Sequence, residues 1–153
     1  MNHITTYKIF ENSSSIKEET EELLANLTDE GHIIVVTLYG PDSESRFYSE
    51  RPYLKIDIRN EKWPKHFKYE DIYSDINRMV DYLSDRYTLS YLLVYYLPKN
   101  SKPLDQIKKL NFGSQSSTSI KLPTIDSRPD NLHPSIKELE DTITDIVILL
   151  RKI

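Results

Sequence analysis

Histidines are the first residues to consider for chemistry, because an imidazole ligates metal ions and moves protons near neutral pH. No two of them stand three or four residues apart, the spacing that would place two imidazoles on one helix face for zinc. His32 begins an apolar run and is expected to be structural, and His66 is expected to be solvated in a loop. A general base also needs a positioned partner, and the sequence indicates none. The four are His3, His32, His66 and His133.

Carboxylates gather between residues 40 and 50 and raise the question of a metal site. Asp42, Glu44 and Glu50 carry the oxygen ligands that Mg²⁺ and Ca²⁺ prefer, but the glycine and spacing of an EF-hand loop are absent. A nuclease would need an acid, a hydrophobic residue and a lysine in that order, whereas Lys55-Ile56-Asp57 runs the opposite way. The pattern favours a solvated turn. A metal-dependent hydrolase using these carboxylates or Asp57 is the alternative.

Other catalytic motifs are missing from the sequence. The three glycines, Gly31, Gly40 and Gly113, form no phosphate-binding loop, and no serine stands in a nucleophile-elbow motif. The chain has no cysteine, which excludes disulfides and thiolate metal sites. We therefore expect a protein that binds a partner rather than an enzyme, with no cofactor and no bound metal.

A basic segment with the chain's only tryptophan is the best candidate contact region. Between residues 46 and 68 there are seven Lys or Arg residues against three acids, although the whole chain has a net charge of −4. Trp63 either covers the core while its lysine neighbours extend into water, or anchors a contact with a partner. The predicted partner-binding residues are Arg46, Arg51, Lys55, Arg59, Lys62, Trp63, Lys65, His66 and Lys68.

The elements that must position this segment follow from hydrophobic periodicity. Strands are expected over 4–10, 32–39, 53–59 and 90–97, and helices over 16–27 and 70–87. This βαββαβ order is that of the α+β ferredoxin-like sandwich, the split βαβ fold. The second and fourth strands are the most apolar, although that fold places them at the sheet edges. Either something covers the open face of the sheet or the strand order differs.

The last third of the chain is expected to differ in character from residues 1–98. Residues 99–133 predict a short helix after Pro103, and then a flexible Ser- and Pro-rich connection. Residues 134–153 predict an amphipathic helical extension of a single domain, packed on the core or on a second copy as a homodimer. Its apolar stripe consists of Ile136, Leu139, Ile143, Ile146, Leu150 and Ile153.

Two classes of partner fit the basic segment. An acidic protein surface is the expected one, because cations steer an oppositely charged partner. Nucleic acid is the alternative, through the phosphates. RNA-recognition domains share the predicted element order and present aromatics on the first and third strands, where Tyr7 and Tyr53 would lie. The segment RPYLKIDI nevertheless lacks the glycine and second aromatic of their third-strand signature.

Composition completes the expectations. In 153 residues, 38% are hydrophobic and 29% charged, which suits one folded domain. No apolar run is long enough to span a membrane, and residues 1–15 lack the pattern of a secretory signal, so a cytoplasmic location is expected. Abundant Ile, Lys, Asn and Tyr, whose codons are AT-rich, suggest a bacterial or phage source. A regulator, an immunity protein or an inhibitor from a mobile element would fit these features.

Overall fold

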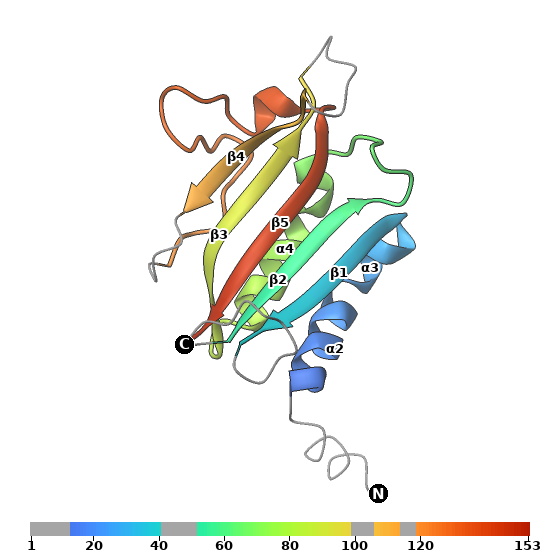
Figure 1. Ribbon diagram of the computed structural model, residues 1–153, viewed down its shortest axis with the longest axis vertical. Coiled ribbons are helices and arrows are strands. Elements are labelled where there is room, and N and C mark those ends of the chain that lie inside the picture. The colour runs from blue at the N-terminus through green and yellow to red at the C-terminus, as the bar shows by residue number, and fades with distance from the viewer. Residues whose placement is uncertain (1–12, 41–51, 99–105, 114–118) are drawn as a thin grey trace, which may run out of the picture.

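The computed structural model describes residues 13–40, 52–98, 106–113 and 119–153, which form a five-stranded antiparallel sheet with helices on one face (Figure 1). The strand order is β1-β2-β5-β3-β4. The elements are α2 (Ser13–Leu23), α3 (Ala25–Asp29), β1 (His32–Tyr39), β2 (Tyr53–Asn60), α4 (Tyr69–Tyr82), β3 (Tyr87–Tyr96), β4 (Lys108–Gly113), the short 3-10 helix η2 (Lys137–Leu139) and β5 (Ile143–Lys152).

The α+β class and the elements between residues 13 and 96 agree with the sequence predictions. The expected strands at 32–39, 53–59 and 90–97 correspond to β1, β2 and β3, and α4 lies within the expected helix at 70–87, apart from its first residue. The expected helix at 16–27 is divided into α2 and α3 at Leu24, whose amide bonds to the carbonyls of both Thr20 and Glu21. The strand predicted at 4–10 lies outside the described residues.

The predicted C-terminal helix is wrong, because residues 143–152 form β5, a central strand of the sheet. Ile146, Ile148 and Leu150 face the helices and have at most 1% exposure, while Val147 and Leu149 face the other way. A strand that is buried on both faces is apolar throughout, and such a run also contains the spacings of a helical stripe. Of the predicted helix-packing residues, Ile136, Leu139, Ile143, Ile146 and Leu150 are buried within this chain, and Ile153 is 67% exposed.

The ferredoxin-like strand order is likewise not that of the described strands. β2, α4 and β3 form a split βαβ unit, since β2 and β3 both run antiparallel to β5, which lies between them. The expected fold would fill that central position with its first strand, whereas here β5 fills it (Figure 1). The short helix predicted after Pro103 is also wrong over its second half, where residues 108–113 form β4 at the sheet edge.

The core lies between the sheet and the helices. On β2, Leu54, Ile56 and Ile58 are completely buried, and on α4 the fully buried Ile72, Ile76 and Met79 lie on one face. Burying each such side chain contributes about 1.5–3 kcal/mol. The core therefore fixes which face of β2 points away from the helices.

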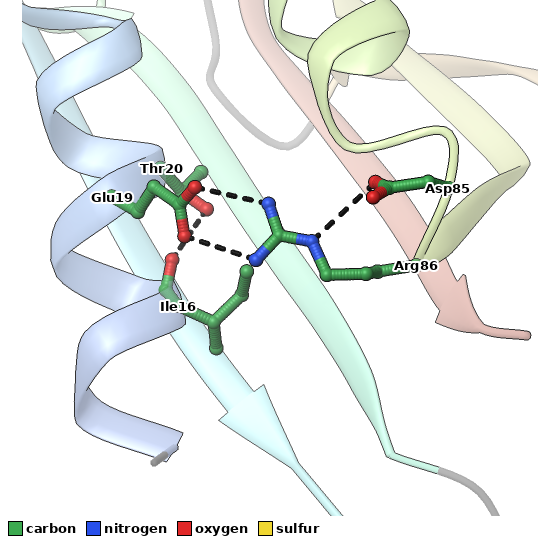
Figure 2. Close-up of polar contacts among 5 residues, drawn as sticks. All are labelled: Ile16, Glu19, Thr20, Asp85 and Arg86. Atoms are coloured by element: carbon green, nitrogen blue, oxygen red, sulfur yellow. Dashed lines mark hydrogen bonds and ion pairs between the residues drawn. The ribbon is translucent and has the colours of Figure 1, made fainter. Parts of the chain in front are cut away.

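An ion pair fastens α2 to the turn before β3 (Figure 2). The two terminal nitrogens of Arg86 donate to the two carboxylate oxygens of Glu19, at 3.2 and 3.0 Å. Arg86 Nε also lies 3.5 Å from an oxygen of Asp85. The hydrogen bonds from Arg86 lower the pKa of Glu19 below its usual value, despite partial burial that acts the other way. This pair holds the N-terminal helix against the sheet from one end.

Candidate functional site

The candidate site is the face of the sheet that points away from the helices, here called the open face. Successive side chains of a strand point to opposite faces, so the burial of Leu54, Ile56 and Ile58 directs Lys55, Asp57 and Arg59 to the open face. All the described helices lie on the opposite side (Figure 1). The open face thus consists of side chains from the strands themselves.

A strip of apolar side chains runs across the centre of the open face. Leu93, Val147 and Leu149 retain only 9%, 6% and 4% exposure, yet they lie outside the main core cluster. Leu93 pairs with Val147 in the register of β3 and β5. On β1, beyond the charged open-face residues of β2, Ile33 and Val35 are apolar again and are 43% and 49% exposed. No described helix lies over these residues, but only Ile33 and Val35 present apolar area to solvent.

Trp63 lies at one end of the open face, in the turn between β2 and α4. Its indole Nε1 donates a 2.8 Å hydrogen bond to Asp145 Oδ1. The Arg59 guanidinium lies 5.7 Å from the centre of the indole ring, and its Nε is 3.5 Å from Asp145 Oδ2. The indole is therefore held by a cation on its ring face and a carboxylate at its edge, while the residue stays 38% exposed.

A second aromatic cluster lies at the opposite end of the open face. Tyr39 and Tyr53 stack with ring centres 4.9 Å apart, and the Arg151 guanidinium is 6.0 Å from the Tyr53 ring. Burial raises the pKa of Tyr53, and Tyr39 and Tyr91 raise it further, while Arg151 acts in the opposite direction. Tyr53 and Arg59 are six positions apart on β2, which separates the two clusters by about 20 Å.

Two carboxylates, Asp57 and Asp145, occupy the middle of the open face. Burial raises the pKa of Asp57, and the nearby Asp145 raises it further, whereas Arg59 lowers it. Asp57 Oδ1 is buried and accepts no hydrogen bond, and its ion pair with Arg59 is long, at 3.8 Å. Burial also raises the pKa of Tyr95, reinforced by both carboxylates. Asp57 Oδ1 is therefore a buried acceptor without a donor, which costs stability in the folded state.

The structure brings part of the predicted contact segment to this face. Lys55, Arg59 and Trp63 belong to the open face, and Lys62, Lys65 and His66 are exposed in the adjoining turn. Lys68 lies 3.8 Å from Glu140 in an ion pair instead. Arg46 and Arg51 lie outside the described residues. The segment-based prediction missed the open-face residues of other strands, which include Ile33, Val35, Thr37, Tyr39, Tyr91, Leu93, Tyr95, Lys109, Asn111, Asp145, Val147, Leu149 and Arg151.

The residues considered for metal binding or catalysis do not form a cluster in the described part of the chain. Within these ranges, no group of three His, Asp or Glu side chains is arranged to hold a metal ion. Asp42, Glu44 and Glu50, the carboxylates considered for a hydrolase, lie outside the described residues. His32 is buried with its Nδ1 3.2 Å from the Leu27 carbonyl and its ring edge-on to Phe67, as expected for a structural residue.

Comparisons with known proteins add no function. No protein-family model matches the chain, and neither a curated protein nor a solved structure matches it. Among the helices that the structure describes, none has the length and apolar character needed to cross a membrane.

Proposed function

We propose that this chain is a binding protein without catalytic activity, which contacts an acidic surface of a partner protein through its open face. Regulators, immunity proteins and phage-encoded inhibitors act in this way. The observation that carries the proposal is the set of partly exposed tyrosines, arginines and Trp63 on the open face, which surrounds the nearly buried Leu93, Val147 and Leu149. Tyr, Trp and Arg are the residues most enriched where binding energy concentrates in protein interfaces.

Charge on the open face supports an acidic partner. Lys55, Arg59, Lys109 and Arg151 carry positive charge there, and Lys62 and Lys65 add to it from the adjoining turn. Only Asp57 and Asp145 oppose them on the described part of that face. Asp145 is already engaged by Trp63 and Arg59, so its charge is largely compensated. A partner surface with carboxylates around an apolar centre would match this distribution.

The Trp63 cluster supplies a preorganised anchor for such a partner. Arg59 and Asp145 already hold the indole in place, so little side-chain entropy remains to be lost on binding. A fixed and partly exposed tryptophan at the end of an apolar strip fits the centre or border of an interface. The cations around it then become the polar rim.

Nucleic acid is the second candidate, favoured by the tyrosines on the face. Tyr53, Tyr91 and Tyr95 lie on strands β2 and β3, where stacking with unpaired bases is chemically possible. Against it stands the exposure of the apolar side chains Ile33 and Val35 on the same face, which a phosphate backbone would gain nothing by covering. The protein partner is therefore the preferred proposal.

A capture experiment with charge-reversed variants tests the proposal. The immobilised chain is exposed to lysate of the cells that encode it, with and without nuclease, and bound proteins are identified by mass spectrometry. Capture should survive nuclease and should be lost in the double variant Lys55→Glu/Lys109→Glu. The matched control Lys121→Glu/Lys137→Glu changes exposed lysines that lie outside the open face and should capture normally.

Two results would contradict the protein-partner proposal. If nuclease abolishes capture and binding weakens steeply with added salt, the partner is nucleic acid, since phosphate binding releases counterions. If the open-face double variant captures as well as the control double variant does, the contact lies elsewhere on the molecule. In that case Trp63→Ala combined with Lys62→Glu and Lys65→Glu shows whether the adjoining turn alone makes it.

A further inference from the structure

Besides the open face, the outer edge of β1 is a surface that could bind a partner, through backbone hydrogen bonds. β1 is an eight-residue strand, His32–Tyr39, that pairs with β2 in an uninterrupted register without a bulge. Among the described strands, β2 is its only neighbour. Its sequence, HIIVVTLY, contains no lysine, acid or proline. Edge strands with these properties present unpaired backbone donors and acceptors that pair readily with another strand.

The opposite edge of the same sheet is protected in the usual ways. β4 has six residues, and it begins with two exposed lysines, Lys108 and Lys109. It ends at Gly113, whose φ is +92° and where a Cβ would collide with the Ser90 carbonyl oxygen. Charge and short length discourage the addition of a strand there. The β4 edge carries features that prevent strand addition, and the β1 edge lacks them.

Apolar side chains of β1 are only partly covered on both faces of the sheet. Ile33 and Val35 are exposed on the open face, and Ile34 and Leu38 are half-buried on the helix face. A strand added beside β1 would cover all four. It would therefore gain hydrophobic stabilisation as well as backbone hydrogen bonds.

Acidic helices flank this edge. α2 and α3 pack against β1, and they are the described helices closest to it (Figure 1). Between Lys17 and Glu30 they carry five carboxylates that are exposed and form no ion pair within the described residues. Only Glu19 is engaged, by Arg86. The five are Glu18, Glu21, Glu22, Asp29 and Glu30.

We propose that the β1 edge binds an extended, positively charged segment of a partner protein as a sixth strand of the sheet. The segment would alternate apolar residues, over Ile33 and Val35, with Lys or Arg. The stems of these cations would pack along Ile34 and Leu38, and their charged ends would reach the carboxylates of α2 and α3. This site lies along the edge of the sheet and shares Ile33 and Val35 with the open face, but its partner has the opposite charge, and it does not depend on the function proposed above.

A second copy of the chain is the less suitable occupant. Pairing β1 with β1 of another copy would bring the acidic α2 and α3 of both copies close together, where their charges repel. A basic segment meets the same carboxylates with the opposite sign. The backbone of the β1 edge would pair with a basic segment or with a second copy. Charge complementarity therefore favours the basic segment.

Defined peptides test the proposal without knowledge of the natural partner. The probe is a blocked seven-residue peptide of alternating valine and lysine, and binding is followed by calorimetry. It should bind at least tenfold more tightly than the same peptide with glutamate for lysine. Methylation of alternate peptide nitrogens keeps the charge but removes backbone donors, and it should weaken binding by a similar factor. Equal binding of either control peptide would overturn the proposal.

Variants of the chain locate the peptide. Glu21→Lys/Glu22→Lys should weaken binding of the valine–lysine peptide about tenfold at low salt, in line with two exposed charge pairs. Val35→Lys should do the same through the edge itself, with its fold checked by circular dichroism. Asn111→Lys on β4 and the open-face variant Lys55→Glu/Lys109→Glu should not weaken it. Loss of peptide binding in the open-face variant, with Glu21→Lys/Glu22→Lys unaffected, would overturn the assignment.

Sedimentation tests whether a second copy of the chain occupies the β1 edge. The chain alone should sediment at its monomer mass of 18.0 kDa. A species of twice that mass, which Val35→Lys returns to monomer, would show that a second copy occupies the edge. That result would overturn the proposal even if the peptide also bound.

Discussion

Trp63 donates its indole hydrogen bond to Asp145, a residue 82 positions away in sequence, and so joins the turn after β2 to the central strand β5. Arg59 completes the arrangement by contacting both the ring and the carboxylate. The tryptophan among cations is therefore neither buried in the main core nor free in solvent. Its environment combines a structural contact with a partly exposed ring, which is the condition for an anchor on a binding face.

The bond between Trp63 and Asp145 can be removed while the aromatic ring is kept. We expect Trp63→Phe to lower the free energy of unfolding by about 1 kcal/mol, the typical net value of one hydrogen bond. Urea denaturation followed by circular dichroism measures it. The exposed Leu132→Ala should change stability by less than about 0.5 kcal/mol. A Trp63→Phe protein as stable as the wild type would show that the bond adds nothing to the fold.

The negative charge of Asp57 is expected to lower the free energy of unfolding. Because burial raises its pKa, the folded state holds the proton more tightly than the unfolded state does, and ionisation above that pKa disfavours folding. We expect Asp57→Asn to increase the free energy of unfolding at pH 7, on the order of 1 kcal/mol. The gain should shrink as the pH falls through the raised pKa of Asp57 and vanish below its ordinary value of 3.8. Urea titrations at several pH values test this, and a stability loss at pH 7 would contradict it.

Glu19 should show the opposite pH dependence. Its pKa is lowered by Arg86, so its contribution is fully present above the ordinary value of 4.5 and is lost as the pH falls through the lowered pKa. We expect Glu19→Gln to cost about 0.5–1 kcal/mol at neutral pH, a modest value because both side chains are partly solvated. Glu22→Gln, an exposed residue of the same helix, is the matched control. A cost for Glu19→Gln that stays constant down to acidic pH would contradict the ion-pair explanation.

The strand assignment of residues 143–152 has its own test. Ile148 is completely buried between β2 and β3, so Ile148→Ala should cost about 2–5 kcal/mol. Ile153 is largely exposed, and Ile153→Ala should be close to neutral. The predicted helix placed Ile153 in its packed stripe, whereas the structure leaves it exposed, so the two assignments differ at Ile153. Thermal and urea unfolding of the two variants distinguish them.

Local patterns in the sequence predicted those helices and strands that have one face exposed to solvent. β2 alternates Leu54, Ile56 and Ile58 with charged residues, and α4 has a clear apolar stripe, so both were predicted correctly. β5 is buried on both faces, and its apolar run fits a strand and a helix equally well. Strand order was also out of reach, because it depends on pairings between segments that are far apart in sequence.

The candidate site was predictable only in its contiguous part. Lys55, Arg59 and Trp63 belong to one charged segment and were found through composition. Asp145 and Arg151 reach the open face only through the register of β5 with its neighbours, which no local pattern reveals. The mistaken helix at that position removed them from consideration. An error in one element thus hid the four open-face residues of β5, which are Asp145, Val147, Leu149 and Arg151.

The central position of β5 also bears on how the chain folds during its synthesis. β2 and β3 leave the ribosome dozens of residues before the strand that fills the gap between them. Until that strand emerges, the inner edges of both lack their partner and their apolar side chains stay open to other chains. Folding as a cooperative sheet is therefore a late event, governed by distant contacts and slower than that of a locally connected fold of the same size.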